Sequence, residues 1–205
     1  MSGSPCVVSR NRPCQFILLI GLLLTFMVPA PALAQTPDYI VNTTDDVDDG
    51  VCDGVHCSLR EAINASNATP GHEIIGFGIP GTGPHTIVPT STLPECSDSL
   101  TIAGATQSGY AGSPVVAIDG SNVGSNPGYG LALTGGGSTV RGLALHSFTT
   151  ASHAIYLGYG DVGAGNVVEG CYIGTDFSGT AALGNLNGIN VRTHGNRIGG
   201  TAPGA

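Results

Sequence analysis

The sequence is poor in positive charge. It has 205 residues, with no lysine and no tryptophan, and its six basic residues are all arginines against fourteen acidic residues. Binding to the phosphate backbone of a nucleic acid requires clustered positive charge, so the composition argues against a nucleic-acid partner. Anionic lipid surfaces are disfavoured for the same reason.

Glycine, by contrast, is abundant. The chain has 33 glycines, about one residue in six, against a usual share of roughly 7%. These glycines follow no every-third-residue period, which excludes collagen, and a hydrophobic content of 41% is too high for a disordered chain. Because glycine favours turns and weakens long helices, the composition predicts a folded, turn-rich β protein.

Long hydrophobic runs are missing except near the N-terminus. Arginines precede an apolar run over residues 16–28, and Ala32-Leu33-Ala34 then fits the cleavage site of a secretory signal peptide. The run is shorter than the roughly 20 residues that cross a bilayer, so a retained membrane anchor is the weaker alternative. We therefore expect residues 1–34 to be removed near Ala34. The mature chain is then secreted or displayed on the cell surface, with no membrane span.

Export changes the interpretation of the four cysteines that follow this cleavage site, because disulfides form in oxidising compartments. Cys52 and Cys57 are separated by a short turn-forming sequence and are predicted to form a disulfide. A zinc site that includes His56 is the alternative, although a second ligand pair at comparable spacing is missing. Cys171 lies in an apolar strand pattern and is expected to be a small core residue, whereas the state of Cys96 stays open.

A cluster of carboxylates over residues 45–53 suggests calcium, because hard cations favour clustered oxygen ligands. The spacing of an EF-hand fails, since the acidic residues needed at its third and twelfth positions are missing. A solvated acidic loop is the favoured interpretation, and no cofactor is expected, with calcium kept as a weak candidate. The candidate calcium ligands are Asp45, Asp46, Asp48 and Asp49.

A short helix is predicted to follow this loop. Ser58-Leu-Arg-Glu61 has the spacing of a capping box. In this motif the serine side chain accepts a hydrogen bond from the glutamate backbone N–H, and the glutamate side chain accepts one from the serine backbone N–H. Leu59 and Ile63 fall on one face of the helix, and Pro70 ends it. Such a helix has only a narrow apolar stripe, so we expect it to cap a larger structure.

The rest of the sequence contains a repeat. Residues 137–142, 165–170 and 195–200 each read glycine, a polar residue or two, an aliphatic position and a closing glycine, at offsets of 28 and 30 residues. A fixed offset of this size indicates a solenoid, in which each copy forms one coil. Adjacent coils then lie about 4.8 Å apart, so equivalent side chains form ladders.

Two ladders follow from this alignment. Val140 is expected to lie above Val168 inside the coils, and Ser138, Asn166 and Asn196 are expected to stack at one turn, where polar side chains can hydrogen-bond neighbouring turns. The side chains predicted to be buried are Val140, Leu143, Leu145, Val168, Ile173 and Ile198.

The segment Cys57-Ser-Leu-Arg-Glu-Ala-Ile63 resembles the N-terminal module of bacterial exported proteins that carry a CSLREA motif. Residues 172–176 and 196–200 are similar to later parts of the same family. The resemblance implies an all-β, right-handed parallel β-helix of the pectin-lyase-like type. It divides the mature chain into a capping module over 35–70 and coils over 71–205, which are expected to continue beyond Ala205. It implies an extracellular setting and no assigned activity.

Catalysis has little support in the sequence. A polysaccharide lyase needs a base and a cation or arginine, and a glycoside hydrolase needs two carboxylates about 5 to 10 Å apart. The aspartates of the coils, including Asp176, lie in glycine-rich turns, where aspartate is an ordinary turn former. His146, His153 and His194 are scattered and are expected to be surface or turn residues. No catalytic residue is assigned.

Binding is easier to support. Strand alternation places the side chains of Tyr156 and Tyr172 outward, where aromatic rings suit stacking on sugars. Arg141 and Glu169 become neighbours on the outer face. We therefore expect a β-helix that serves adhesion, extracellular structure or glycan binding, with an extracellular glycan or a cell-surface partner. The alternative is a polysaccharide-degrading enzyme of the same fold.

Overall fold

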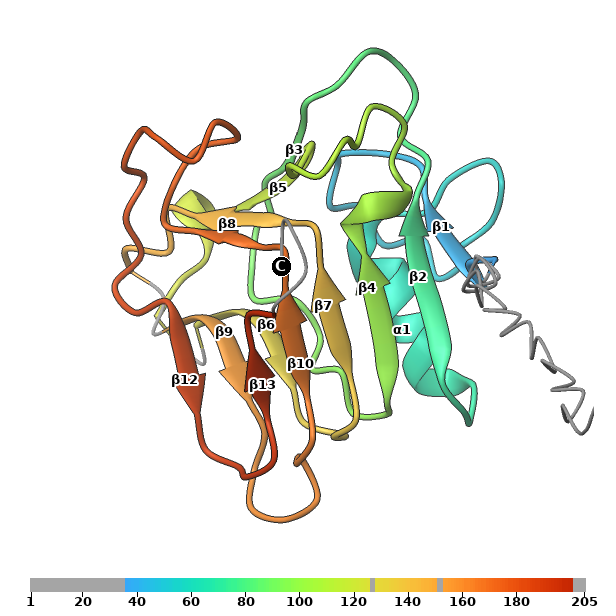
Figure 1. Ribbon diagram of the computed structural model, residues 1–205. Coiled ribbons are helices and arrows are strands. Elements are labelled where there is room, and N and C mark those ends of the chain that lie inside the picture. Colours follow the sequence, from blue (N-terminus) through green and yellow to red (C-terminus); the bar gives the residue numbers. More distant parts are fainter. Residues whose placement is uncertain (1–35, 126–127, 151–152, 201–205) are drawn as a thin grey trace, which may run out of the picture. The chain divides into compact units, whose positions relative to one another are not determined.

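The structure is a computed structural model that describes residues 36–125, 128–150 and 153–200; the predicted signal peptide lies outside these residues. The strands of the described chain wind into a parallel β-helix (Figure 1). From β2 onward, consecutive strands lie in different sheets, and each strand pairs in parallel with its equivalent in the next coil. The predicted fold class is confirmed.

Three sheets form the sides of the helix. Sheet A has the strand order β1 (Tyr39–Val41), β2 (Glu73–Phe77), β4 (Leu100–Ala103), β7 (Thr139–Arg141), β10 (Val167–Glu169) and β13 (Arg197–Ile198). Sheet B has the order β11 (Tyr172–Ile173), β8 (Ala144–His146), β5 (Val116–Asp119) and β3 (His85–Ile87). Sheet C has the order β12 (Ile189–Val191), β9 (His153–Leu157) and β6 (Tyr129–Leu133). Short 3-10 turns at Gly104–Thr106 and Gly120–Asn122 follow β4 and β5.

An aliphatic ladder runs through sheet A inside the coils. Val140 pairs with Val168, as the offset of 28 residues predicts. The same register continues to Ile102 and Ile75 on one side and to Ile198 on the other. Because each coil stacks its aliphatic side chains on those of the next coil, burial repeats with the period of the coils. Val140, Val168, Leu143 and Leu145 are at most 2% exposed, as predicted.

Two residues predicted to be buried are not. Ile198 is 53% exposed, although it occupies the same ladder position as Val168. It lies in β13, and no described residue stacks on its outer side. Ile173 of β11 is half-buried for a similar reason, because β11 is the last strand of sheet B among the described residues. The repeat therefore predicted the direction of these side chains correctly and their burial wrongly.

The polar ladder at the turn before sheet A is confirmed. The backbone N–H of Ser138 donates to Asn166 Oδ1 at 3.0 Å, and the backbone N–H of Asn166 donates to Asn196 Oδ1 at 2.9 Å. Ser138 Oγ accepts from the Leu100 N–H in the preceding coil. Ser138 and Asn166 are fully buried, so these side chains satisfy backbone donors that water does not reach.

The helix α1 (Leu59–Ala68) covers the first coils beside β1 and β2 (Figure 1). It begins at Leu59, directly after its N-cap residue Ser58, as predicted. Leu59 and Ile63 are fully buried against the aliphatic core. α1 has ten residues, and no helix in the described part of the chain has the length and apolar character needed to cross a bilayer.

Candidate functional site

The loop before α1 is closed by a disulfide between Cys52 and Cys57, as predicted. The capping box is also confirmed: Ser58 Oγ accepts from the Glu61 N–H at 3.2 Å, and the Ser58 N–H donates to Glu61 Oε2 at 2.8 Å. Glu61 Oε1 accepts a further bond from the Asp49 N–H at 2.7 Å. The Glu61 side chain is 1% exposed, so a buried carboxylate joins the loop to the first turn of the helix.

The candidate calcium ligands of this loop are each engaged with protein groups. Asp45 accepts from Thr43 and from the Val47 N–H, and Asp48 accepts from the Gly50 N–H. These contacts close tight local turns, in which aspartate side chains commonly cap the backbone.

Asp46 has a different role, because it forms a two-bond ion pair with Arg60 at 2.9 and 3.0 Å and also accepts from Thr90. Its side chain is 3% exposed. The Asp46–Arg60 pair therefore ties the acidic loop to α1 and to the segment after β3.

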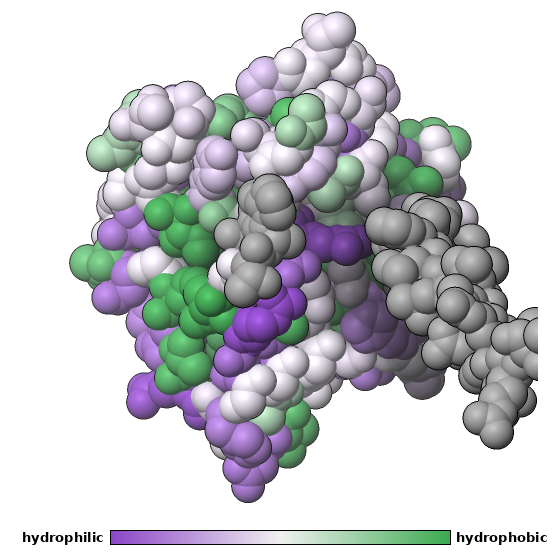
Figure 2. All heavy atoms as spheres, viewed as in Figure 1, coloured by the Kyte–Doolittle hydropathy of each residue, from purple (hydrophilic) through white to green (hydrophobic). Residues whose placement is uncertain are grey.

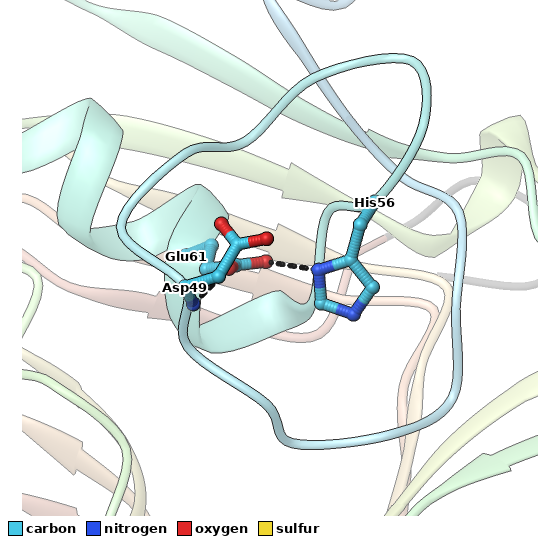
Figure 3. A group of neighbouring side chains, drawn as sticks. All are labelled: Asp49, His56 and Glu61. Carbon is cyan, nitrogen blue, oxygen red and sulfur yellow. Dashed lines mark hydrogen bonds and ion pairs between the residues drawn. The ribbon is translucent and has the colours of Figure 1, made fainter.

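His56 contacts the carboxylates of Asp45 and Glu61, and Figure 3 shows its ring facing Glu61 and Asp49. Its Nε2 is 3.1 Å from Asp45 Oδ1, and its Nδ1 is 3.0 Å from Glu61 Oε2. The first contact is a hydrogen bond, whereas the second lacks hydrogen-bond alignment, so Nδ1 is buried without a hydrogen-bond partner among the described residues. One ligand atom from each of Asp49, His56 and Glu61 lies within 4.8 Å of the others. We call these three residues the His56 cluster.

Charge in this cluster shifts two pKa values. The hydrogen bond to Asp45, together with the negative charges of Glu61, Asp45 and Asp49, raises the pKa of His56 above its usual value, against the opposing effect of desolvation. The pKa of Asp45 is lowered, first by its hydrogen bond from Thr43 and then by the Val47 N–H and His56. Both shifts favour a positively charged group next to the carboxylates.

A second concentration of functional groups lies at sheet C, on β6, on β9 and just after β9. The rings of Tyr129 and Tyr156 stack with their centroids 4.8 Å apart, and His153 lies 6.0 Å from Tyr156. Tyr159 packs on Tyr156 at 5.2 Å with the planes tilted by 53°. Aromatic pairs prefer such offset or tilted arrangements. We call Tyr129, His153, Tyr156 and Tyr159 the aromatic cluster.

The burial of these rings is uneven. Tyr156 points outward from sheet C, as strand alternation predicts, but it is only 6% exposed because its neighbours cover its ring. Tyr159 is 53% exposed and is the ring most open to solvent. Its hydroxyl lies 3.5 Å from that of Tyr129, and this hydrogen bond raises the pKa of Tyr159. Tyr156 thus supports the exposed ring and does not offer a free face itself.

Polar groups border the aromatic cluster. His153 Nε2 lies 2.8 Å from the Asn190 side-chain amide, on the neighbouring strand β12. Burial lowers the pKa of His153, and the positive charge of the exposed Arg192 lowers it further. An imidazole, an amide and a guanidinium therefore lie at the His153 side of the aromatic cluster.

The other predicted ligand residues lie on different sheets. Arg141 is exposed on sheet A and pairs in register with Glu169, as predicted, whereas Glu169 forms its ion pair with Arg197 at 2.8 Å. Tyr172 is half-buried on sheet B, where its hydroxyl donates to Ser113 Oγ at 3.3 Å. The structure therefore does not gather the four predicted residues into one site.

The two free cysteines and Asp176 have surroundings that suit a structural role and not a catalytic one. Cys96 and Cys171 are free thiols, and burial raises their pKa values to about 12 and about 11. Thiols of such high pKa are unreactive near neutral pH. Asp176 Oδ1 accepts hydrogen bonds from Ser178, Thr180 and Ala181, so it caps its own loop.

Sequence reasoning identified Tyr156 but missed Tyr129, His153 and Tyr159 as its partners, and it treated His56 only as a zinc alternative with thiols. The coil repeat could have found only the pairing of Tyr129 with His153, because the register of β6 and β9 places Tyr156 beside Ala132 and Tyr159 lies after β9. Comparison with known protein families, with curated proteins and with solved structures finds no match for this chain. The interpretation of these sites therefore depends on their geometry.

Proposed function

We propose that the protein is an exported β-helix that contacts extracellular glycans through the aromatic cluster, in an adhesive or matrix role and without catalysis of its own. The observation that carries this proposal is the exposed ring of Tyr159, which packs on Tyr156, whose ring in turn stacks on Tyr129. Sugars present C–H groups on one face and hydroxyls at the edge. An aromatic cluster that offers the face of Tyr159, with Asn190 and Arg192 beside its member His153, matches both features.

Two further features support the extracellular setting. The Cys52–Cys57 disulfide is of the kind that persists in oxidising compartments. The signal-peptide pattern and the resemblance to CSLREA-motif proteins point to the same setting, and the capping box at Ser58 and Glu61 lies within that motif. A rigid solenoid also suits binding, because rings held by neighbouring coils lose little freedom when a ligand docks.

The test is a binding assay with a panel of neutral and acidic polysaccharides. We expect the purified protein to bind at least one of them, and Tyr159→Ala to weaken that binding about tenfold, equivalent to about 1.4 kcal/mol. Tyr172→Ala is the matched control, because Tyr172 is a tyrosine on a different sheet. Equal loss in both variants, or no binding to any glycan, would contradict the assignment of this surface.

The same incubation distinguishes binding from degradation. A lyase releases unsaturated ends and a hydrolase releases reducing ends, so both are measured with and without calcium. We expect neither product. Release that disappears when Glu169 or Asp176 is replaced by its amide would establish the enzyme instead.

A further inference from the structure

We propose that the His56 cluster binds a divalent transition-metal ion of the zinc type, held by His56 Nδ1 and by the carboxylates of Asp49 and Glu61. This site differs from the calcium and cysteine sites that the sequence suggests. It uses no thiol, because both neighbouring cysteines are in the disulfide. An imidazole with two carboxylates is a ligand set that zinc accepts, whereas calcium and magnesium prefer oxygen ligands alone.

The His56 ring is oriented by Asp45. Asp45 Oδ1 contacts Nε2 at 3.1 Å, and a carboxylate oxygen accepts hydrogen bonds. Nε2 therefore carries the proton of this hydrogen bond. A carboxylate that fixes the outer nitrogen of a histidine in this way is the usual second partner of a metal-bound imidazole.

The inner nitrogen of this ring, Nδ1, faces Glu61. Nδ1 is buried and makes no hydrogen bond within the described residues, yet it lies 3.0 Å from Glu61 Oε2. Both oxygens of Glu61 already accept backbone N–H groups. These two atoms form an ion pair when His56 is protonated, and a divalent ion that displaces the Nδ1 proton can bind both of them.

The size of the site fits a small ion. Bonds of about 2.0 to 2.2 Å place two ligand atoms roughly 3.4 Å apart on a tetrahedral ion. The His56 and Glu61 atoms are close to this separation, and the oxygen of the exposed Asp49 lies within 4.8 Å. A cavity of about 350 Å³, whose lining includes Asp48, Cys52 and Glu61, lies at the Glu61 side of the cluster.

The consequence of binding is structural. The ion joins Asp49 of the acidic loop and His56 of the disulfide-closed loop to the first turn of α1, which carries Glu61 (Figure 3). It thereby fastens the loop onto the capping helix. The role is independent of glycan binding, since the aromatic cluster belongs to sheet C and this site to the loop before α1.

The experiment titrates Zn²⁺ into the full-length purified protein after chelator treatment, with a competing indicator dye to measure affinity and stoichiometry. Co²⁺ absorption reports the coordination of the ion. We expect one Zn²⁺ per chain, a higher melting temperature with Zn²⁺ and no effect of Ca²⁺. Asp45→Asn, which changes only the orienting partner, weakens binding about 10- to 100-fold. His56→Gln and Asp49→Asn remove ligand atoms and weaken it more.

Matched controls are His194→Gln and Asp161→Asn, which alter a fully surface-located pair whose nearest atoms are 3.6 Å apart. Both are expected to bind Zn²⁺ like the unmodified protein. Asp49→Asn keeps the proposal testable if His56→Gln misfolds, because an asparagine oxygen can still accept from the Val51 N–H as Asp49 does. Absence of saturable Zn²⁺ binding, or binding that both ligand variants retain, would overturn the proposal.

Discussion

The residues at the two ends of the described aliphatic ladder in sheet A point the same way, but one is buried and the other is exposed to solvent. At one end, Ile75 is fully buried, and the capping helix places Leu59 and Ile63 over the first coils. At the other end, Ile198 in the same ladder is 53% exposed. Figure 2 shows hydrophobic side chains on this side of the molecule around β12, where Val191 is 45% exposed.

This difference shows that burial in a solenoid depends on the neighbouring coil more than on the residue itself. The strand period sets which side chains point inward, and it does so equally for Ile75 and Ile198. A side chain that points inward is removed from water only when another layer stacks on it. The stability contributed by each ladder position should therefore fall from the capped end toward β13.

The largest expected effect on stability comes from placing a charge at each end of the aliphatic ladder in turn. Leu59→Asp buries an unpaired charge under the cap and is expected to lower the free energy of unfolding by about 4 kcal/mol or more. Ile198→Asp leaves its carboxylate in water and is expected to change stability by no more than about 0.5 kcal/mol. Urea unfolding measures both. Equal effects would show that α1 is not a cap.

A smaller difference in stability is expected between two variants of the polar ladder. Asn166→Ala removes the acceptor of the fully buried Ser138 N–H, and an unsatisfied buried donor costs about 1 to 3 kcal/mol. Asn196→Ala removes the acceptor of the Asn166 N–H, and Asn196 is only partly buried, so water can replace its side chain and we expect about 1 kcal/mol or less. A larger loss for Asn196→Ala in the same urea experiment would contradict the gradient.

The smallest effect concerns acid sensitivity at sheet C. Burial and Arg192 lower the pKa of His153, so the folded protein binds this proton less readily than the unfolded chain. Stability is therefore full above the unfolded pKa of about 6.5 and decreases as the pH falls from there toward the lower folded pKa. Melting temperatures measured from pH 7.5 to 5 should show this decrease. His153→Gln should reduce it and His194→Gln should retain it; an unchanged slope in His153→Gln would exclude His153 as the source.

The candidate sites were less predictable than the fold. Strand alternation predicted correctly that the Tyr156 side chain points outward. The prediction that this side chain is exposed was wrong, because the rings of Tyr129 and Tyr159 cover it. Arg141 and Glu169 were correctly paired, yet they lie on sheet A, away from the sheet that carries the aromatic cluster. Positions on one strand follow a simple period, whereas the gathering of side chains on one face depends on how long each connecting turn is.

The sequence by itself determined the parallel β-helix, the register of Val140 with Val168 and the capping box at Ser58 and Glu61. Each of these rests on spacing that is short or strictly repeated, so local geometry and the coil length define it. Only the tertiary structure decided that Tyr159 rests on its neighbours and that His56 Nδ1 faces Glu61. Those contacts require the folding of irregular loops onto a rigid scaffold, and no periodicity in the chain encodes the path of such loops.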